Sequence, residues 1–452
     1  MAPLSSSLLS IGLLAASLLS LCSAKDVPET FVASEFSTWT DSYDGSKVGR
    51  IVVDLDDGST IDVARLDLVG SASQRGFAAG KLLADDIVEF VDVKMNEYFS
   101  GEVTGLDISS LPEWLQEVLQ PLIEKGGEIA PQVFWSALNY VWEREVEYVP
   151  APIIAEMEGI GAGVCASDSA PADCDADEWA TKIKNINMLP ELVRMACTAF
   201  GAYGSATPDG GLIQLRSLDF GSGPFANYTV LQVHHPPEPA QAFVSLSFPG
   251  FVGVITGVSE KGIGVSEKVW MTYDTPDIQP GSYDGLADVL VIREILENAE
   301  DREAAESYLQ SVARTWTIWL GVGDYASQRF DLVGYKQKDV TVYSDETIGQ
   351  ETGQPLLKDI CYVDKHPQPS TATDLPELLQ SYAGNVTFGA VQDIVQQHGT
   401  GDVHWASYDF LKKKMVVAVG RVDENGKYQH DSWKAYGRPA LLFDLEDLWA
   451  GK

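Results

Sequence analysis

Residues 195 to 220 read MACTAFGAYGSATPDGGLIQLRSLDF. The stretch predicts two short strands, residues 197–204 and 211–219, joined by a turn rich in Pro, Asp and Gly. Such a hairpin folds the end of the second strand back beside the start of the first. Arg216 and Asp219 then come close to Cys197, although they are distant in sequence. A thiol beside a guanidinium and a carboxylate is a candidate nucleophile whose charge environment its neighbours supply.

Three later stretches extend this pattern: GVSEKGIGVSEKVW at 257–270, CYVDKHPQPS at 361–370 and TGDVHWASYDF at 400–410. Together with the hairpin they resemble the N-terminal-nucleophile (Ntn) hydrolases that use a cysteine. The likeness runs from about Val63 to the C-terminus. It is strongest to the acid-ceramidase-like branch with its dcd1-type proteins, and the acyl-CoA:aminopenicillanate acyltransferase and phospholipase-B-like families are related. The resemblance implies an α+β fold, a four-layer αββα sandwich of two antiparallel sheets.

The resemblance also implies self-cleavage between Ala196 and Cys197. The new α-amine would act as the base for its own thiol, because an α-amino group has a pKa of about 7.7 to 8.0. In this interpretation Arg216 stabilises the thiolate and Asp219 orients the ammonium. The alternatives are a buried structural cysteine and a surface ion pair of little energetic value. Residues 216 and 219 have opposite parity, so both reach the cysteine only if the strand ends or bulges near Leu218.

The candidate oxyanion donors differ from those of related proteins. Related proteins carry an asparagine after the strand that corresponds to 262–270 and a second one later in the chain. Here Lys268 and Val269 fill the first place, where a backbone N–H can still serve as the donor. Lys365 or His366 would substitute at the second place. Lys268 and Glu267 could instead simply pair with each other.

Composition limits the partners. The chain has 452 residues and is 45% hydrophobic, enough for one large domain or two smaller ones. It has 66 acidic and 31 basic residues, a net charge of −35, which argues against a nucleic-acid partner. The acidic excess favours solubility, and adaptation to an acidic lumen is the alternative interpretation.

Residues 1–24 are uncharged and rich in Leu and Ala, and they end in Cys-Ser-Ala. This pattern predicts a secretory signal peptide and a secreted or lysosomal protein, with a membrane anchor as the alternative. Asn227 and Asn385 begin glycosylation motifs, which agrees with that route.

Four cysteines follow the signal segment. Cys165 and Cys174 flank a short acidic loop and predict a local disulfide. Cys197 and Cys361 are then expected to stay free, since a bond between them would remove the nucleophile. No metal and no cofactor are predicted, because the histidines lack ligand spacing.

The organisation changes at Cys197. Residues 25–196 form a mostly helical part, called the pro-part below, in which Gly76 and Gly80 are expected to allow close helix packing. By resemblance the pro-part becomes a light chain that stays bound after cleavage. Residues 197–452 form the catalytic part, with strands, then helices at 286–299 and 302–313, then strands again. Asp301 is expected to cap the second helix.

The expected activity is hydrolysis of a linear amide through a Cys197 thioester, with an N-acyl lipid such as ceramide or an N-acylethanolamine as substrate. An acyltransferase and a phospholipase-B-like ester hydrolase are alternatives on the same scaffold. A non-catalytic lipid-binding relative is a third. Besides the lipid amide, the expected partners are the two chains of one precursor, and peripheral membrane contact is an option.

Overall fold

The computed structural model describes residues 28–56, 58–100, 116, 120, 131–193, 196–221, 223–270, 283–315, 317–370 and 373–451. The predicted signal peptide at 1–24 lies outside the described residues. Among the described residues, no helix is long and apolar enough to cross a membrane.

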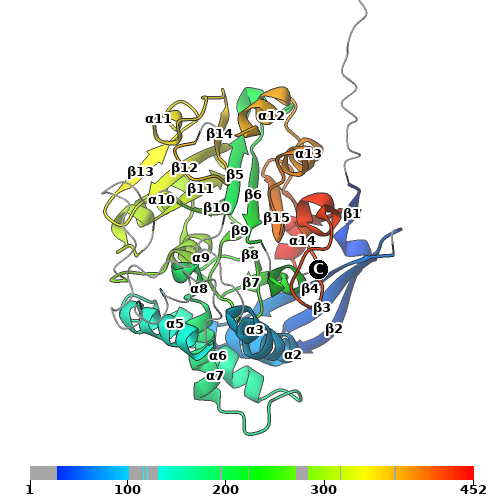
Figure 1. Ribbon diagram of the computed structural model, residues 1–452, viewed down its shortest axis with the longest axis vertical. Coiled ribbons are helices and arrows are strands. Elements are labelled where there is room, and N and C mark those ends of the chain that lie inside the picture. The colour runs from blue at the N-terminus through cyan, green and yellow to red at the C-terminus, as the bar shows by residue number, and fades with distance from the viewer. Residues whose placement is uncertain are drawn as a thin grey trace, which may run out of the picture.

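The described strands form two sheets (Figure 1). Sheet A has seven strands in the order β1-β17-β16-β15-β6-β5-β14. In that order they are Thr30–Val32, Ala440–Asp444, Lys414–Val419, His404–Asp409, Ile213–Asp219, Ala196–Ala202 and Ile360–Val363. Sheet B has ten strands in the order β13-β12-β11-β10-β9-β8-β7-β4-β3-β2. They are Val340–Tyr343, Arg329–Tyr335, Ile318–Asp324, Ile263–Val269, Thr256–Ser259, Phe243–Ser247, Val230–His235, Thr60–Val69, Ser46–Asp54 and Ser37–Tyr43.

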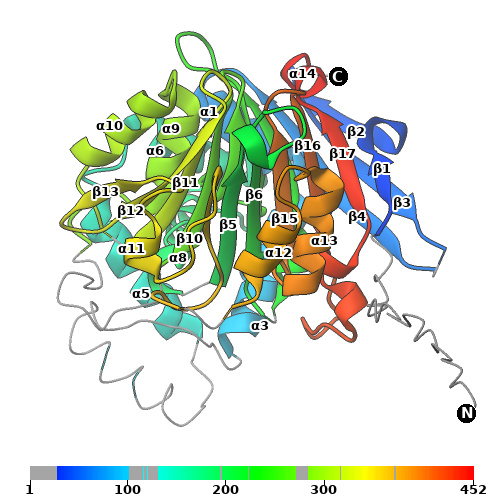
Figure 2. The same ribbon diagram turned by 90° about the horizontal axis from the view of Figure 1, so that it is seen from above.

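Helices cover the outer face of each sheet (Figure 2). On sheet A lie α12 (Leu375–Ser381) and α13 (Phe388–His398). Sheet B is covered by α1 (Ala72–Leu82), α6 (Ala151–Cys165), α9 (Asp288–Asn298) and α10 (Arg302–Ser311), backed by α5 (Pro131–Glu145) and α7 (Ala176–Ile186). The shorter helices are α2 (Ala84–Val88), the π-helix η2 (Glu89–Lys94), α3 (Met95–Ser100), α8 (Leu189–Leu192), α11 (Gly349–Thr352) and α14 (Leu445–Trp449). The predicted four-layer α+β sandwich is confirmed.

Apolar side chains fill all three spaces between these layers. The central space holds side chains from both sheets, among them Ala199, Leu231, Trp319 and Cys361. Phe200 and Leu215 of sheet A point the other way, towards α12 and α13. Because successive strand residues alternate between faces, a residue of β5 or β6 can be assigned to a face by its parity. Odd-numbered β5 residues and even-numbered β6 residues face the centre of the sandwich.

The sheets are mixed, whereas the sequence analysis predicted antiparallel ones. β4 pairs with β7 in parallel, and β1 pairs with β17 in parallel. Both parallel pairs join a strand of the pro-part to a strand of the catalytic part. Hairpin neighbours pair antiparallel because their connection is short, whereas strands distant in sequence can meet in either direction. Strands from both sides of Cys197 therefore share each sheet, and the division at 197 stays a prediction.

The helical portion of the pro-part packs through glycines, as expected. A Cβ atom on Gly76 would lie 2.0 Å from the Glu156 carbonyl oxygen, and one on Gly80 would lie 2.1 Å from that of Ile160. These glycines let the backbones of α1 and α6 approach closely. Asp301 caps α10 through a bond from the Ala304 amide, which confirms that prediction.

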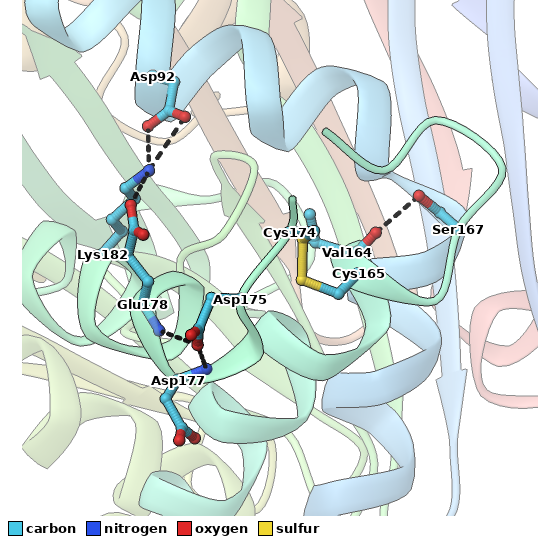
Figure 3. Close-up of a disulfide and its surroundings, with 9 residues drawn as sticks. All are labelled: Asp92, Val164, Cys165, Ser167, Cys174, Asp175, Asp177, Glu178 and Lys182. Atoms are coloured by element: carbon cyan, nitrogen blue, oxygen red, sulfur yellow. Dashed lines mark hydrogen bonds and ion pairs between the residues drawn. A yellow bond between two sulfur atoms is a disulfide. The ribbon is translucent and has the colours of Figure 1, made fainter. Parts of the chain in front are cut away.

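The loop after α6 is closed by a disulfide between Cys165 and Cys174 (Figure 3). Next to it Asp175 caps α7 by accepting the amides of Asp177 and Glu178 at 2.9 and 3.1 Å. The predicted local disulfide is thus present in the structure.

Candidate active site

Cys197 is the second residue of β5, and it pairs with Leu218 of β6. Its side chain is fully buried and faces the space between the sheets. Its thiol is free, as is that of Cys361, so the alternative of a Cys197–Cys361 disulfide does not occur in the structure. The thiol is therefore chemically available as a nucleophile, although solvent does not reach it.

Arg216 is the cationic neighbour of this thiol. It lies two positions before Leu218 on β6 and so projects from the same face as Cys197. Its Nη2 atom donates to Cys197 Sγ over 3.2 Å. The same nitrogen lies 3.0 Å from Glu267 Oε2, and Nε donates to the Glu267 carbonyl over 3.2 Å. The guanidinium thus bridges the sulfur to the buried carboxylate of β10.

This role of Glu267 is not evident from the sequence. A pair between Glu267 and Lys268 was the possibility considered there, but Glu267 forms its ion pair with Arg216. Adjacent residues of a strand point to opposite faces, which works against pairing between immediate neighbours. The contact from β6 to β10 crosses between the two sheets, and only the packing of one sheet on the other reveals it.

Asp219 lies on the other face of β6. Its register partner is Ala196, and the pairing of β5 with β6 runs without a shift from Ala196 to Ala202. No bulge brings Asp219 round to the sulfur. Its carboxylate instead accepts the Thr400 hydroxyl at 2.5 Å and the Gly401 amide at 2.7 Å. Arg216 is therefore next to the sulfur, while Asp219 is beside the backbone where the predicted scissile bond lies.

Burial dominates the titration of these groups. It raises the pKa of the Cys197 thiol to about 12, although Arg216 and Lys268 act in the opposite direction. Burial also raises the pKa of Asp219, opposed by the Thr400 hydroxyl and by the charge of Lys365. In the uncut chain described here the thiol is therefore protonated at neutral pH.

The four oxyanion candidates lie in different surroundings. Lys268 is fully buried, and its Nζ donates to the Val269 carbonyl over 2.9 Å. Burial lowers the pKa of Lys268 to about 8, and the nearby Cys197, Asp364 and Glu267 oppose that shift. Val269 is a regular residue of β10, paired with Ile318 of β11.

The side chains of Lys365 and His366 form hydrogen bonds to groups other than Cys197. Lys365 donates to the carbonyls of His398 and Gly399, at 3.3 and 2.5 Å, where α13 ends. His366 bonds to Asp364 over 3.1 Å, and its side chain is 40% exposed. Of the four candidates, Lys268 is the one whose ammonium interacts electrostatically with Cys197.

An apolar cavity of about 30 Å³ lies next to this site. Leu218, the register partner of Cys197, is part of its wall. Aromatic residues form much of the rest: Phe220, Phe225, Phe248 and Phe251. Leu189, Pro190 and Val193, which precede the predicted cleavage point in the sequence, also line the cavity.

No metal site accompanies the cysteine. Within the described ranges, no group of three or more His, Cys, Asp or Glu side chains is arranged to hold a metal ion. His234 and His235 follow one another on β7, and only His234 is fully buried. His234 Nδ1 lies 3.6 Å from Glu156, and the same carboxylate pairs with Arg75 and Arg293 in a buried cluster.

Comparison with curated proteins shows the family. Protein dcd1A of Dictyostelium discoideum is 30% identical over 402 residues, covering 85% of this chain and 85% of that protein. Protein dcd1B of the same organism is 31% identical over 415 residues, covering 89% of this chain and 77% of that protein. The chain belongs to the dcd1 family. The resemblance to dcd1-type proteins is thereby confirmed. A search of protein-family profiles found no match.

Solved structures show more distant likenesses. A Caenorhabditis elegans N-acylethanolamine-hydrolyzing acid amidase ortholog matches with a TM-score of 0.36 and 14% identity, covering 48% of this chain and 93% of that one. Penicillin V acylase from Agrobacterium tumefaciens matches with a TM-score of 0.34 and 13% identity, covering 49% and 83%.

Proposed function

We propose that this dcd1-family chain is a self-processing cysteine hydrolase of linear amides, of the Ntn type and closest to the acid-ceramidase-like branch. The observation that carries the proposal is the pair of contacts around one cysteine. Arg216 donates to the buried, unpaired Sγ of Cys197, and Asp219 lies opposite Ala196 across the hairpin. A cation at the sulfur and an anion at the adjoining backbone are what a nucleophile with its own α-amine as base requires.

The first reaction is cleavage of the chain itself. The Cys197 sulfur loses its proton and attacks the carbonyl carbon of Ala196. The C–N bond breaks, the nitrogen of Cys197 takes up a proton, and a thioester joins Ala196 to the sulfur. Water then hydrolyses the thioester, which leaves a carboxylate on Ala196 and restores the thiol. The products are a light chain that ends at Ala196 and a heavy chain that begins with Cys197.

Turnover uses the amine made in that step. The neutral α-amine takes the thiol proton, and the sulfur attacks the substrate carbonyl to give an acyl-thioester and a free amine. Arg216 stabilises the thiolate, and Asp219 holds the ammonium. The oxyanion is held by N–H donors, for which the Lys268 ammonium and the Val269 amide are the candidates of β10. Water releases the fatty acid.

The substrate proposal is an N-acyl lipid, such as a ceramide or an N-acylethanolamine. The wall of Leu218, Phe225 and Phe248 beside the site supports this choice. These side chains are apolar, so they suit the hydrocarbon chain of a fatty-acyl group. At about 30 Å³ the cavity cannot hold such a chain while Leu189, Pro190 and Val193 of the pro-part form part of its wall. Entry of the substrate therefore requires this segment of the pro-part to move after cleavage.

The proposed location is a secreted or lysosomal one. The disulfide between Cys165 and Cys174 supports an oxidising compartment. Both glycosylation motifs also fit the secretory route, and Asn385 is exposed at the surface. Peripheral contact with a membrane would deliver the lipid.

The function is tested with purified protein and three substrates: a ceramide, an N-acylethanolamine and a lysophospholipid. Release of fatty acid from the amides at a rate at least tenfold above that from the ester supports the proposal. Faster release from the lysophospholipid would favour a phospholipase-B-like ester hydrolase. Formation of a fatty hydroxamate when hydroxylamine is added would report acyl transfer from the thioester. An uncut chain that binds these lipids without turnover would favour a binding protein.

A further inference from the structure

The stretch Thr400-Gly-Asp-Val-His404 was singled out in the sequence without a role. It connects the C-terminus of α13 to β15, and His404 is the first residue of that strand. Thr400 and His404 are fully buried, and Asp402 is nearly so. The segment lies directly against the end of β6, since the Val403 amide donates to the Leu218 carbonyl over 3.1 Å. It therefore adjoins both charged residues of the site.

One half of the segment holds Asp219. The Asp219 carboxylate accepts the Thr400 hydroxyl at 2.5 Å and the Gly401 amide at 2.7 Å. In return the Asp402 carboxylate accepts the amides of Phe220 and Gly221, both at 2.9 Å. The two chain segments thus exchange carboxylate-to-backbone bonds in both directions. This arrangement fixes where the Asp219 carboxylate lies relative to Ala196.

The direction of the Thr400 bond follows from its surroundings. Its oxygen also lies 2.9 Å from Thr198 Oγ1 and 2.7 Å from Ser217 Oγ. An ionised carboxylate can only accept, so Asp219 competes with Thr198 Oγ1 for the single hydroxyl proton of Thr400, and its contact is the shorter of the two; Ser217 Oγ can donate to the Thr400 oxygen. Bonds between a donor and an ionised carboxylate are among the stronger hydrogen bonds of proteins.

The other half of the segment contacts Arg216. Arg216 Nη1 lies 3.3 Å from His404 Nε2, and the guanidinium has only donors, so Nε2 accepts. Burial and the charge of Arg216 hold the pKa of His404 well below its usual value, which keeps the ring neutral and able to accept. Thr256 Oγ1 lies 3.3 Å from the same ring nitrogen. His404 thus restricts the position of the Arg216 guanidinium beside the Cys197 sulfur.

We infer that Thr400 and His404 are positioning residues for the two charges of the nucleophile, Thr400 acting on Asp219 and His404 on Arg216. The inference rests on the proposed function and deepens it, because it names the groups that orient the site without touching the reacting atoms. The charged and titratable groups near Asp219 are Cys197, Lys365, Asp402 and Tyr428. Thr400 does not titrate over the range of the pH profile, so its replacement leaves the net charge of the site unchanged.

The test compares Thr400→Val and Thr400→Ser with the wild type, using a fluorogenic fatty-acyl amide of aminomethylcoumarin. We expect Thr400→Val to lower kcat by about 10- to 100-fold with little change in KM. The acid limb of its pH profile should move upward by roughly one pH unit, because Asp219 loses a bond that favours its ionised form. Thr400→Ser keeps the hydroxyl and should recover most of the rate and the original limb.

A matched control is Thr387→Val, at the other end of α13. Thr387 caps the helix by accepting the Ala390 amide, and the 11 residues of α13 separate it from the Thr400 end. Its replacement should lower the melting temperature and leave the pH profile unchanged. A structural role of Thr400 alone would give the same result as this control.

A second pair of variants keeps the inference testable if Thr400→Val does not fold. His404→Gln retains an acceptor for Arg216, and His404→Phe removes it at similar size. We expect a rate loss of about tenfold or more for His404→Phe and a smaller loss for His404→Gln. If the wild type is active and both Thr400→Val and His404→Phe match its rate and pH profile, the inference is wrong and the proposed function stands. A wild type that is neither cut nor active overturns both.

Discussion

The guanidinium of Arg216 lies 3.2 Å from the sulfur of Cys197, with both side chains fully buried. A buried cation needs a counter-charge, and Glu267 supplies it at 3.0 Å. The pair therefore does two things at once. The Glu267 carboxylate neutralises the buried charge of Arg216, and one N–H of the Arg216 guanidinium still points at the thiol.

Stability and activity can be separated at this pair. Arg216→Met leaves Glu267 buried without its partner, which should cost about 3 to 5 kcal/mol of unfolding free energy. The double variant Arg216→Met/Glu267→Gln removes both charges and should regain much of that stability while staying inactive. Denaturant unfolding and amide hydrolysis measure the two properties. A double variant with wild-type turnover would show that Arg216 has no part in the chemistry.

Three buried carboxyl groups should contribute less stability to the fold as the pH rises from about 4.5 to 7. Glu145, Glu191 and Asp288 are buried together, with the Asp288 amide donating to Glu191 over 3.3 Å. Burial raises the pKa of Glu191 to about 7, and burial with the neighbouring carboxylates raises the pKa values of Glu145 and Asp288. A raised folded-state pKa favours the protonated folded form, so this stability is complete below the unfolded pKa and is lost towards pH 7.

The isosteric change Glu191→Gln tests this pH dependence. It mimics the protonated acid and should raise the free energy of unfolding at pH 7 by on the order of 2 to 3 kcal/mol, with little effect at pH 4. Glu143→Gln on the exposed side of α5 is the matched control and should change neither. Unfolding midpoints measured from pH 4 to 7.5 give the comparison. Equal pH slopes for Glu191→Gln and the wild type would contradict the account.

The disulfide between Cys165 and Cys174 should stabilise the fold without linking the two proposed chains. Its cysteines are nine residues apart and both precede Ala196. Replacing both by Ser should lower the free energy of unfolding by about 2 to 3 kcal/mol, as expected for closure of a short loop. Cleaved wild-type protein should separate into two chains on a denaturing gel without reductant. A single band that splits only with reductant would mean that a disulfide joins the chains.

The two glycosylation motifs differ in surroundings. Asn385 is exposed beyond α12, whereas the Asn227 side chain donates to and accepts from the Val422 backbone at 2.9 Å in each direction. In protein secreted from eukaryotic cells, Asn385→Gln should remove one glycan and leave the melting temperature unchanged. Asn227→Gln should lower the melting temperature, because both bonds are lost. Mass spectrometry after deglycosylation counts the glycans, and an unmodified Asn385 would count against the secretory route.

Local features of the fold could be predicted from the sequence because local rules determine them. The hairpin of β5 and β6 follows from a turn between two alternating runs, and the start of α10 follows from its capping Asp301. The parity of residues 216 and 219 correctly placed Arg216 and Asp219 on opposite faces. Each of these depends on residues within one or two elements.

The remaining features depend on how distant segments pack. The parallel pairing of β4 with β7 has no signature in either strand. Glu267 reaches Arg216 from the other sheet, and Thr400 reaches Asp219 across a helix-to-strand connection. Hydroxyls and carboxylates of this kind occur throughout the sequence. Their roles follow only once the two sheets and α13 are placed together.

Self-cleavage before Cys197 is the step on which the proposed hydrolase depends. It is tested by intact mass and N-terminal sequencing of purified wild-type protein and of Cys197→Ala. We expect two wild-type chains, one of which begins Cys-Thr-Ala-Phe, and a single uncut and inactive chain for Cys197→Ala. A wild-type chain that stays whole while hydrolysing amides, or a Cys197→Ala chain that is still cut at this bond, would contradict it.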